Sequence, residues 1–146
     1  MRGGITVGDV ALSYGQLFGP AVNRGYAIES QVARFPRIVV GEEVLREVKN
    51  NPALWVNDAD YDLKATKSLL RRDFDGEYFV DYLRVIEEEL DERSKYPALL
   101  DQHAEFIRHG LRRYKDNASI LAKYKWLREY HRYTVEKWNE RNHPKS

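Results

Sequence analysis

The sequence predicts an α+β fold, in which a small sheet carries helices on one face and is followed by a C-terminal helical hairpin. Three observations predict it. Runs rich in β-branched residues occur at residues 5–10 and 38–40. An Asp-Gly pair at residues 75–76 lies between two strand-like runs, which is a strong hairpin signal. Apolar residues recur at helical spacing over residues 100–138.

The composition is that of a folded chain without thiol chemistry. Apolar residues make up 42% of the 146 residues, which is too many for a disordered protein. The absence of Cys excludes disulfides, a thiolate metal site and a Cys nucleophile. No apolar run approaches the roughly 20 residues that cross a bilayer, and the N-terminus lacks a signal-peptide core. We expect a cytoplasmic protein with no membrane partner.

The first residues predict a strand, a turn and a helix. Residues 4–12 alternate as a strand does, and residues 14–16 form the turn. Pro20 opens a helix over residues 20–33, because Pro at the first position has no N–H to leave unpaired. A strand that begins at residue 3 leaves an open edge. We therefore expect that the sequence starts inside a longer domain or that a partner covers this edge.

The next elements complete a domain that we place at residues 1–84. Residues 37–40 predict a buried strand, and residues 41–50 predict a helix with its acidic residues early. Residues 51–67 read as a polar loop. The runs on either side of the Asp-Gly pair then predict a closing hairpin.

The remaining residues, 85–146, predict a helical tail that packs on the first domain. A short helix ends near Tyr96, and two longer helices follow, joined at residues 115–117, where Asn117 can cap the second. A connection this short favours an antiparallel pair. The expected inward faces of the two helices consist of Leu100, His103, Ile107, Leu111 and Tyr114, and of Ile120, Tyr124, Leu127, His131, Val135 and Trp138.

Charge is divided unevenly along the chain. Residues 42–107 hold 9 Lys or Arg against 17 Asp or Glu, a net charge of −8. Residues 108–146 hold 11 against 4, a net charge of +7. Opposite charges on two segments favour contact between those segments or between two copies of the chain.

The first half of the chain resembles a class III nucleotide cyclase-like domain, in particular its C-terminal half. The order and spacing of four segments carry the resemblance, with the closing hairpin in the place where the family has one. The likeness is greatest to divergent bacterial members that have a helical C-terminal extension. The four segments are Arg2-Gly3-Gly4-Ile5-Thr6-Val7-Gly8, Phe18-Gly19-Pro20-Ala21-Val22-Asn23, Ile28-Glu29-Ser30 and Pro36-Arg37-Ile38-Val39-Val40.

The resemblance implies a partial ferredoxin-like cyclase sheet and an incomplete active site. Asn23 matches the family's ribose-positioning Asn, and Gly19 and Asn23 become the candidate nucleotide-binding residues. The family's charge-stabilising Arg falls on Ala27, and the adjacent Arg24 is turned roughly 100° away on a helix. The two metal-binding Asp residues of the family lie upstream of the strand with which this sequence begins.

The same resemblance sets the expected cofactors and partners. We expect no cofactor in this chain, and Mg²⁺ or Mn²⁺ only together with the missing N-terminal half. A nucleoside triphosphate is the ligand that a complete site would take. Because sites of this family form between two subunits, the expected partner is a second copy of the chain or the missing half.

Three other signals favour simpler interpretations. Asp58, Asp60 and Asp62 lack the Gly and Glu of a calcium loop and predict a solvated acidic loop. His103 belongs to an H-x-E motif, but a zinc deaminase also needs a Cys pair. Basic and aromatic residues alternate over residues 123–138, which could bind nucleic acid, but a net charge of +1 favours a packed helix with its basic face in water.

Four hypotheses follow from the sequence. The first is a degenerate or truncated cyclase-like module that is inactive alone and acts through association. The second is a fragment of an active cyclase that forms a cyclic nucleotide from a nucleoside triphosphate. The third is a nucleic-acid-binding tail, and the fourth is a structural domain without a ligand.

Overall fold

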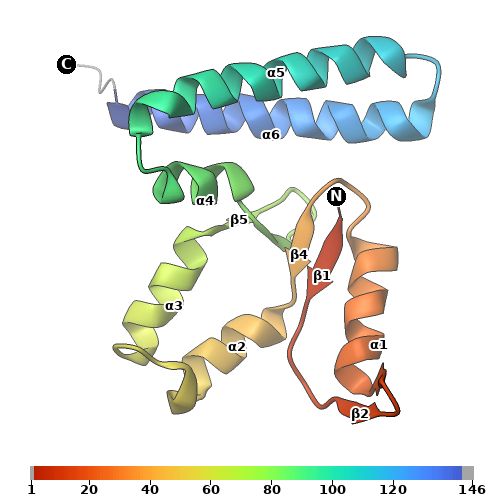
Figure 1. Cartoon of the computed structure of the whole chain (residues 1–146), viewed down its shortest axis with the longest axis vertical. Helices are drawn as coiled ribbons and strands as arrows, with labels where there is room; N and C mark the ends of the chain where they lie inside the picture. Colours follow the sequence, from red (N-terminus) through yellow and green to blue (C-terminus); the bar gives the residue numbers. More distant parts are fainter. Residues whose placement is uncertain (1, 143–146) are drawn as a thin grey trace. The chain divides into compact units, whose positions relative to one another are not determined.

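The computed structural model describes residues 2–142 and divides the chain into two compact units, Met1–Asp81 and Tyr82–Ser146 (Figure 1). The ends of the two predicted domains, residues 1 and 143–146, lie outside the described residues. The first unit contains a sheet with helices, and the second is helical. This mixture confirms the predicted α+β class.

The first unit contains a four-stranded mixed sheet of short strands. β1 is parallel to β4, β4 is antiparallel to β6, and β6 is antiparallel to β5. The strand order is β1-β4-β6-β5, so β1 lies at one edge of this sheet. The bounds are Gly3–Ile5 for β1, Ile38–Val40 for β4, Leu70–Arg72 for β5 and Tyr78–Val80 for β6.

The prediction of one strand over residues 4–12 is wrong, because two separate strands form there. β1 ends at Ile5, and a separate two-stranded ribbon follows, with β2 at Ala11–Ser13 and β3 at Gln16–Phe18. Tyr14 and Gly15 have φ values of 49° and 76°, as the tight turn of a twisted hairpin requires, so the predicted turn is confirmed. Gly8, with a φ of 156°, lies in the break between β1 and β2. The alternation of apolar and other residues continues through this break, so the sequence pattern does not reveal it.

The first helix covers the predicted range as two successive forms. α1 runs from Pro20 to Ala27 and continues as a π-helical turn, η1, over Ile28–Val32. Ile28 is buried in a core with Ala33 and Val39. A Cβ built on Gly4 would lie 2.6 Å from Ile28 Cγ2, so only glycine lets η1 pack this closely on β1.

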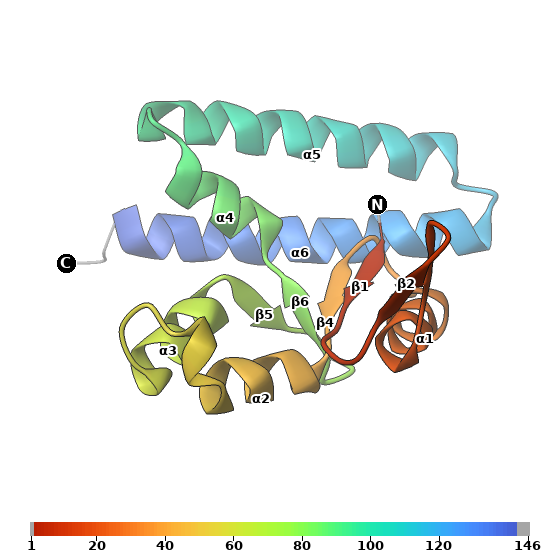
Figure 2. The same ribbon diagram turned by 60° about the horizontal axis from the view of Figure 1, so that its bottom comes forward.

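The loop predicted over residues 51–67 is also wrong, because most of it is helical. α2 spans Glu42–Asn50, a 3₁₀ turn η2 spans Pro52–Leu54, and α3 spans Ala59–Ser68 (Figure 2). The Asp58 carboxylate accepts a hydrogen bond from the Tyr61 amide at 2.8 Å and so caps the start of α3. The acidic stretch is therefore a helix start, whose negative charges favour the positive end of the helix dipole.

A buried arginine joins the closing hairpin to the start of β4. Arg37 has 2% of its surface exposed, and its guanidinium forms ion pairs with Asp73 and Asp75 of the β5–β6 turn. Its Nη1 also lies 3.1 Å from Asp75 Oδ1. Burial opposes the charge on Arg37, but the two carboxylates outweigh burial and raise the pKa of the guanidinium. The turn is thus fixed by two charges that lie 36 and 38 residues from Arg37 in the chain.

The second unit is a short helix followed by a long helical hairpin. α5 and α6 lie side by side and antiparallel, as predicted (Figure 1). Asn117 Oδ1 accepts a hydrogen bond from the Ile120 amide at 3.0 Å, which confirms the predicted cap. None of the helices described in residues 2–142 is long and apolar enough to span a membrane. The helices are α4 at Tyr82–Glu89, η3 at Arg93–Lys95, α5 at Tyr96–Arg113 and α6 at Ala118–Asn142.

Replacing Arg37 by Met is expected to destabilise the first unit by about 3 kcal/mol, because it leaves two carboxylates without their buried partner. Urea unfolding of both variants measures the loss. The matched control is Arg2→Met, which removes the exposed ion pair with Glu29 and should cost less than about 1 kcal/mol. Equal losses in the two variants would show that the buried pairing does not stabilise the fold.

Candidate functional site

The two residues predicted to bind nucleotide lie together at the start of α1. The Asn23 amide donates to the Gly19 carbonyl at 3.2 Å, in the first turn of the helix. The Asn23 side chain is exposed and makes no hydrogen bond with any described residue. A Cβ on Gly19 would lie 2.6 Å from the Asp9 carbonyl oxygen, so this glycine is required for close backbone approach. Asn23 is therefore available to a ligand, whereas the geometry gives Gly19 a structural role.

Arg24, the cation next to Asn23, does not replace the charge-stabilising Arg whose position the resemblance assigns to Ala27. Ala27 lies one helical turn beyond Asn23 and carries no charge. Arg24 is directed instead to α2, where its Nε lies 3.2 Å from Glu43 Oε1. The structure thus brings Asn23 and Gly19 together and leaves Arg24 in an ion pair.

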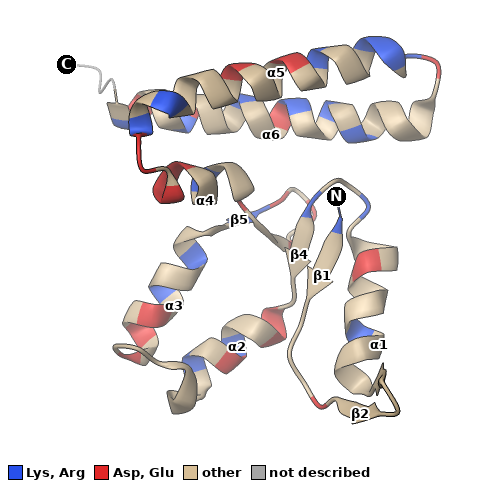
Figure 3. Ribbon diagram, in the orientation of Figure 1, with Lys and Arg blue, Asp and Glu red and all other residues tan. Residues whose placement is uncertain are grey.

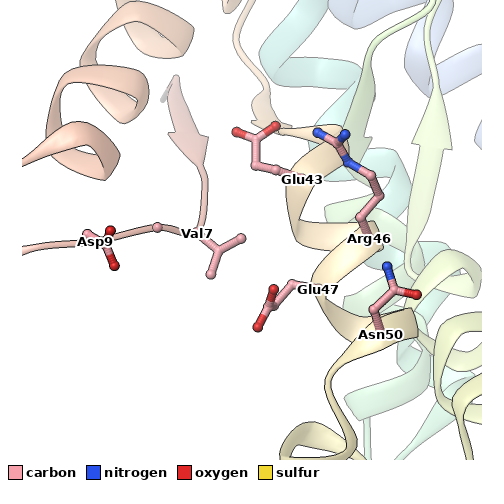
Figure 4. Close-up of a pocket in the computed structure, with 7 residues that line it drawn as sticks. Val7, Asp9, Glu43, Arg46, Glu47 and Asn50 are labelled. Atoms are coloured by element: carbon pink, nitrogen blue, oxygen red, sulfur yellow. The ribbon is translucent and has the colours of Figure 1, made fainter.

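A hollow of about 510 Å³ lies between α2 and the segment that joins β1 to β2 (Figure 4). Glu43 and Glu47, one turn apart on α2, extend toward the segment that carries Val7 and Asp9. Arg46 also lines the hollow and has no ion-pair partner among the described residues. Three carboxylates against one guanidinium leave this hollow with a net charge of −2, which repels a phosphate.

Glu43 connects three elements at the edge of this hollow. The Thr6 hydroxyl donates to Glu43 Oε1 at 2.6 Å, and the Arg24 guanidinium donates to the same oxygen. Burial acts to raise the pKa of Glu43, but the Thr6 hydroxyl, the backbone amide of Glu43 and the Arg24 guanidinium together outweigh it and hold the pKa below its ordinary value. The charged carboxylate therefore ties the end of β1 and α1 to the first turn of α2.

A second hollow, of about 400 Å³, adjoins the first at Glu43 and Arg46. Three arginines line it, but four carboxylates do so as well, which leaves a net charge of −1. Asp75 and Glu43 are already paired with Arg37 and Arg24. Neither hollow therefore forms an anion site from this chain alone. The charged lining residues of the second hollow are Arg24, Arg46, Arg72, Glu42, Glu43, Asp75 and Glu77.

The described residues offer no cluster of three His, Cys, Asp or Glu side chains that could hold a metal ion. The Asp62 carboxylate, for example, is already hydrogen-bonded to the loop just before α3. One oxygen accepts hydrogen bonds from the Val56 amide at 2.8 Å and from the Asn57 amide at 3.1 Å. The Asn57 side-chain amide donates to the other carboxylate oxygen at 3.2 Å. The hydrogen bonds from Asn57 and Val56 lower the pKa of Asp62 and direct both oxygens to this loop.

The aromatic residues of the tail are largely packed inside the protein. Trp126 and Tyr130 are buried and stack on each other with ring centres 5.5 Å apart. Tyr124 is half-buried and stacks on Tyr114. Lys and Arg remain frequent on the α5–α6 hairpin (Figure 3). This arrangement matches a packed helix with a basic outer face more closely than a platform for stacking bases.

The sequence does not predict the Glu43 cluster. It predicts Glu43 only as part of the acidic start of a helix, because the partners Thr6 and Arg24 lie 37 and 19 residues away. The available signal was the pair of acids directly after Gly41, a glycine whose missing Cβ leaves room for the Glu43 carboxylate.

Comparisons of this chain with protein-family models, with curated proteins and with solved structures find no match.

Replacing Thr6 by Val is expected to raise the pKa of Glu43, because it removes the hydroxyl that stabilises the carboxylate. Carboxyl ¹³C shifts measured against pH report the change. Since the pKa of Glu43 is depressed in the folded protein, its contribution to stability is present above the ordinary value of 4.5 and is lost as the pH falls below it.

The control is Ser30→Ala, which removes a hydroxyl that donates to the Tyr26 carbonyl and does not contact Glu43. This variant should leave the Glu43 titration unchanged. An unchanged Glu43 pKa in Thr6→Val would mean that the hydroxyl does not hold the carboxylate in solution.

Proposed function

We propose that this chain is a cyclase-like module with an incomplete catalytic site that acts by associating with a second copy of itself. The observation that carries the proposal is the β2–β3 ribbon. It lies outside the four-stranded sheet, and all six of its strand residues are exposed. An isolated two-stranded hairpin is marginally stable in water, so this ribbon needs a surface to pack on.

The ribbon and the residues that lead into it expose several large apolar side chains. Leu12 and Leu17 face each other across the two strands and have 73% and 57% of their surfaces exposed. Contiguous exposed apolar residues mark sites of association in folded proteins. The other large apolar residues exposed here are Val7, Val10, Tyr14 and Phe18.

Two further features favour a second copy as the occupant. Within residues 2–142, β1 pairs with β4 alone, so one of its edges carries backbone groups without a strand partner in the described chain, a few residues before the ribbon. The chain also carries a segment of net charge −8 and another of net charge +7, which makes two copies complementary to each other. A symmetric dimer uses the same apolar patch twice and closes on itself.

The lack of activity in an isolated chain follows from what the site contains. Of the family's catalytic groups, the resemblance assigns only Asn23 to this chain, and Ala27 stands at the position of the charge-stabilising Arg. The loss of one such stabilising group typically lowers a rate by about 10²–10³. The negative charge of both hollows further supports a module that does not bind a triphosphate alone.

We expect a dimer for the natural sequence in sedimentation velocity and a monomer for the double variant Leu12→Lys, Leu17→Lys. The added charges repel one another when two ribbons meet. In the monomer the two lysines face each other across the strands in water, where their repulsion costs less than about 1 kcal/mol. Circular dichroism checks that the variant remains folded.

The matched control is Val56→Lys, which changes an apolar residue with 90% of its surface exposed outside the ribbon. This variant should remain dimeric. A monomeric natural sequence, or dissociation caused equally by Val56→Lys, would rule out the ribbon as the interface.

Incubation of the purified chain with Mn²⁺ and each nucleoside triphosphate is expected to give no cyclic nucleotide above a protein-free blank. Asn23→Ala should therefore change nothing. Product that is formed by the natural sequence and abolished by Asn23→Ala would contradict the proposal and favour the alternative, a fragment of an active cyclase.

A further inference from the structure

Three side chains from three helices form a hydrogen-bonded chain inside the second unit. The Tyr82 hydroxyl, at the start of α4, lies 2.6 Å from His103 Nε2 on α5. His103 Nδ1 lies 3.1 Å from His131 Nδ1 on α6. The two imidazole rings have centres 5.2 Å apart, and Tyr82 meets His103 edge to face. His103 therefore bridges α4 and α6.

The distance between the two Nδ1 atoms requires one proton between them. With both imidazoles neutral, Tyr82 donates to His103 Nε2, and His103 Nδ1–H donates to His131 Nδ1. One added proton leaves both hydrogen bonds intact. His131 Nδ1–H then donates to His103 Nδ1, and His103, with its proton on Nε2, donates to the Tyr82 oxygen. A second added proton places two N–H groups face to face, and the hydrogen bond between the imidazoles is lost.

The surroundings of the pair oppose this second proton. Burial, followed by the repulsion from His131, lowers the pKa of His103 to about 4. Burial also lowers the pKa of His131, although Asp101 acts in the opposite direction and Arg108 acts with burial. Tyr82 itself packs against Tyr130 of α6, with ring centres 5.0 Å apart. Asp101 is thus the carboxylate that favours protonation, and it acts on His131.

Two further hydrogen bonds hold the start of α4 through the residue after Tyr82. The Leu83 amide donates to the Tyr130 hydroxyl at 3.0 Å, and the Tyr96 hydroxyl donates to the Leu83 carbonyl at 3.0 Å. These hydrogen bonds join tyrosine hydroxyls to the backbone. Near the other end of α4, Glu87 forms an ion pair with Arg141 of α6. The imidazole pair is therefore the titratable contact at the start of α4, and Glu87 belongs to a separate contact near its end.

We propose that Tyr82, His103 and His131 form a proton-operated catch that holds the start of α4 against α5 and α6 at neutral pH and loosens it in acid. This role is independent of nucleotide chemistry and of dimer formation. Because both pKa values are depressed in the folded protein, the stabilisation is complete above pH 6.5 and declines as the pH falls toward about 4. The first amide to report it is that of Leu83, since Tyr82 directly precedes it.

Hydrogen exchange at the Leu83 amide and imidazole NMR shifts, both followed from pH 7 to pH 4, test the catch in the full chain. Protection of Leu83, corrected for intrinsic exchange, should fall by at least about tenfold over the range in which His103 and His131 titrate. The pH dependence should be much smaller in His131→Asn, whose amide oxygen can accept from His103 Nδ1–H but cannot be protonated in this range.

His109→Asn is the matched control, because His109 is an exposed histidine on α5. It should retain the full pH dependence. Tyr82→Phe separates a catch from a merely buried histidine pair. Both imidazoles should still titrate in that variant, while Leu83 protection becomes low at every pH and insensitive to acid.

Two results would overturn the proposal. One is Leu83 protection that stays constant in the natural sequence while His103 becomes protonated. The other is the same loss of protection in Tyr82→Phe as in the natural sequence, because the pH effect would then reach α4 without the hydroxyl. Urea midpoints measured at pH 7 and pH 4.5 for the same variants report whether any of them fails to fold.

Discussion

The sheet of the first unit depends on one buried guanidinium. Arg37 lies directly before β4, the strand that is hydrogen-bonded to both β1 and β6, and it holds the turn between β5 and β6 through Asp73 and Asp75. Strands of three residues offer few hydrogen bonds to fix their register. Two charged contacts at low exposure supply a fixed point, since a buried charge is tolerated only where its partners are in place. Arg37 therefore couples the last pair of strands to the β1–α1–β4 unit.

The β2–β3 ribbon has no comparable contacts. Its tight turn is well formed, yet all its strand residues are exposed, and its apolar pair Leu12 and Leu17 faces water. The Glu43 cluster fixes the chain just before the ribbon, through Thr6 at the end of β1. The ribbon thus begins a few residues after Thr6, which is anchored by Glu43, and it exposes apolar side chains. This combination suits a surface that packs against another chain, and it supports association, rather than ligand binding in the two charged hollows, as the proposed function.

Local signals predicted much of the fold, and distant pairings accounted for the failures. The Asp75-Gly76 hairpin and the Asn117 cap were predicted because the residues that form them are adjacent in the sequence. The sequence does not predict α3, because Asp58 is one of three closely spaced acids whose pattern also fits a polar loop, and its role as a cap depends on the helix that follows. The break after Ile5 was missed because β-branched residues continue through it. The ion pairs of Arg37 could not be predicted, because their partners are more than 30 residues away.

For the candidate site, the position of Asn23 on the first turn of a helix followed from Pro20, whereas the direction of Arg24 toward Glu43 depended on how α1 and α2 pack.

The association of two ribbons can be measured directly with a spin label, because the natural sequence has no Cys and a single introduced thiol gives only intermolecular distances. Gln16→Cys places the label at the exposed tip of the ribbon, next to the turn. Double electron–electron resonance should then show a narrow intermolecular distance, and Leu12→Lys with Leu17→Lys should abolish it. A signal that contains only the background of randomly distributed monomers in the Gln16→Cys chain would contradict the self-association of this module.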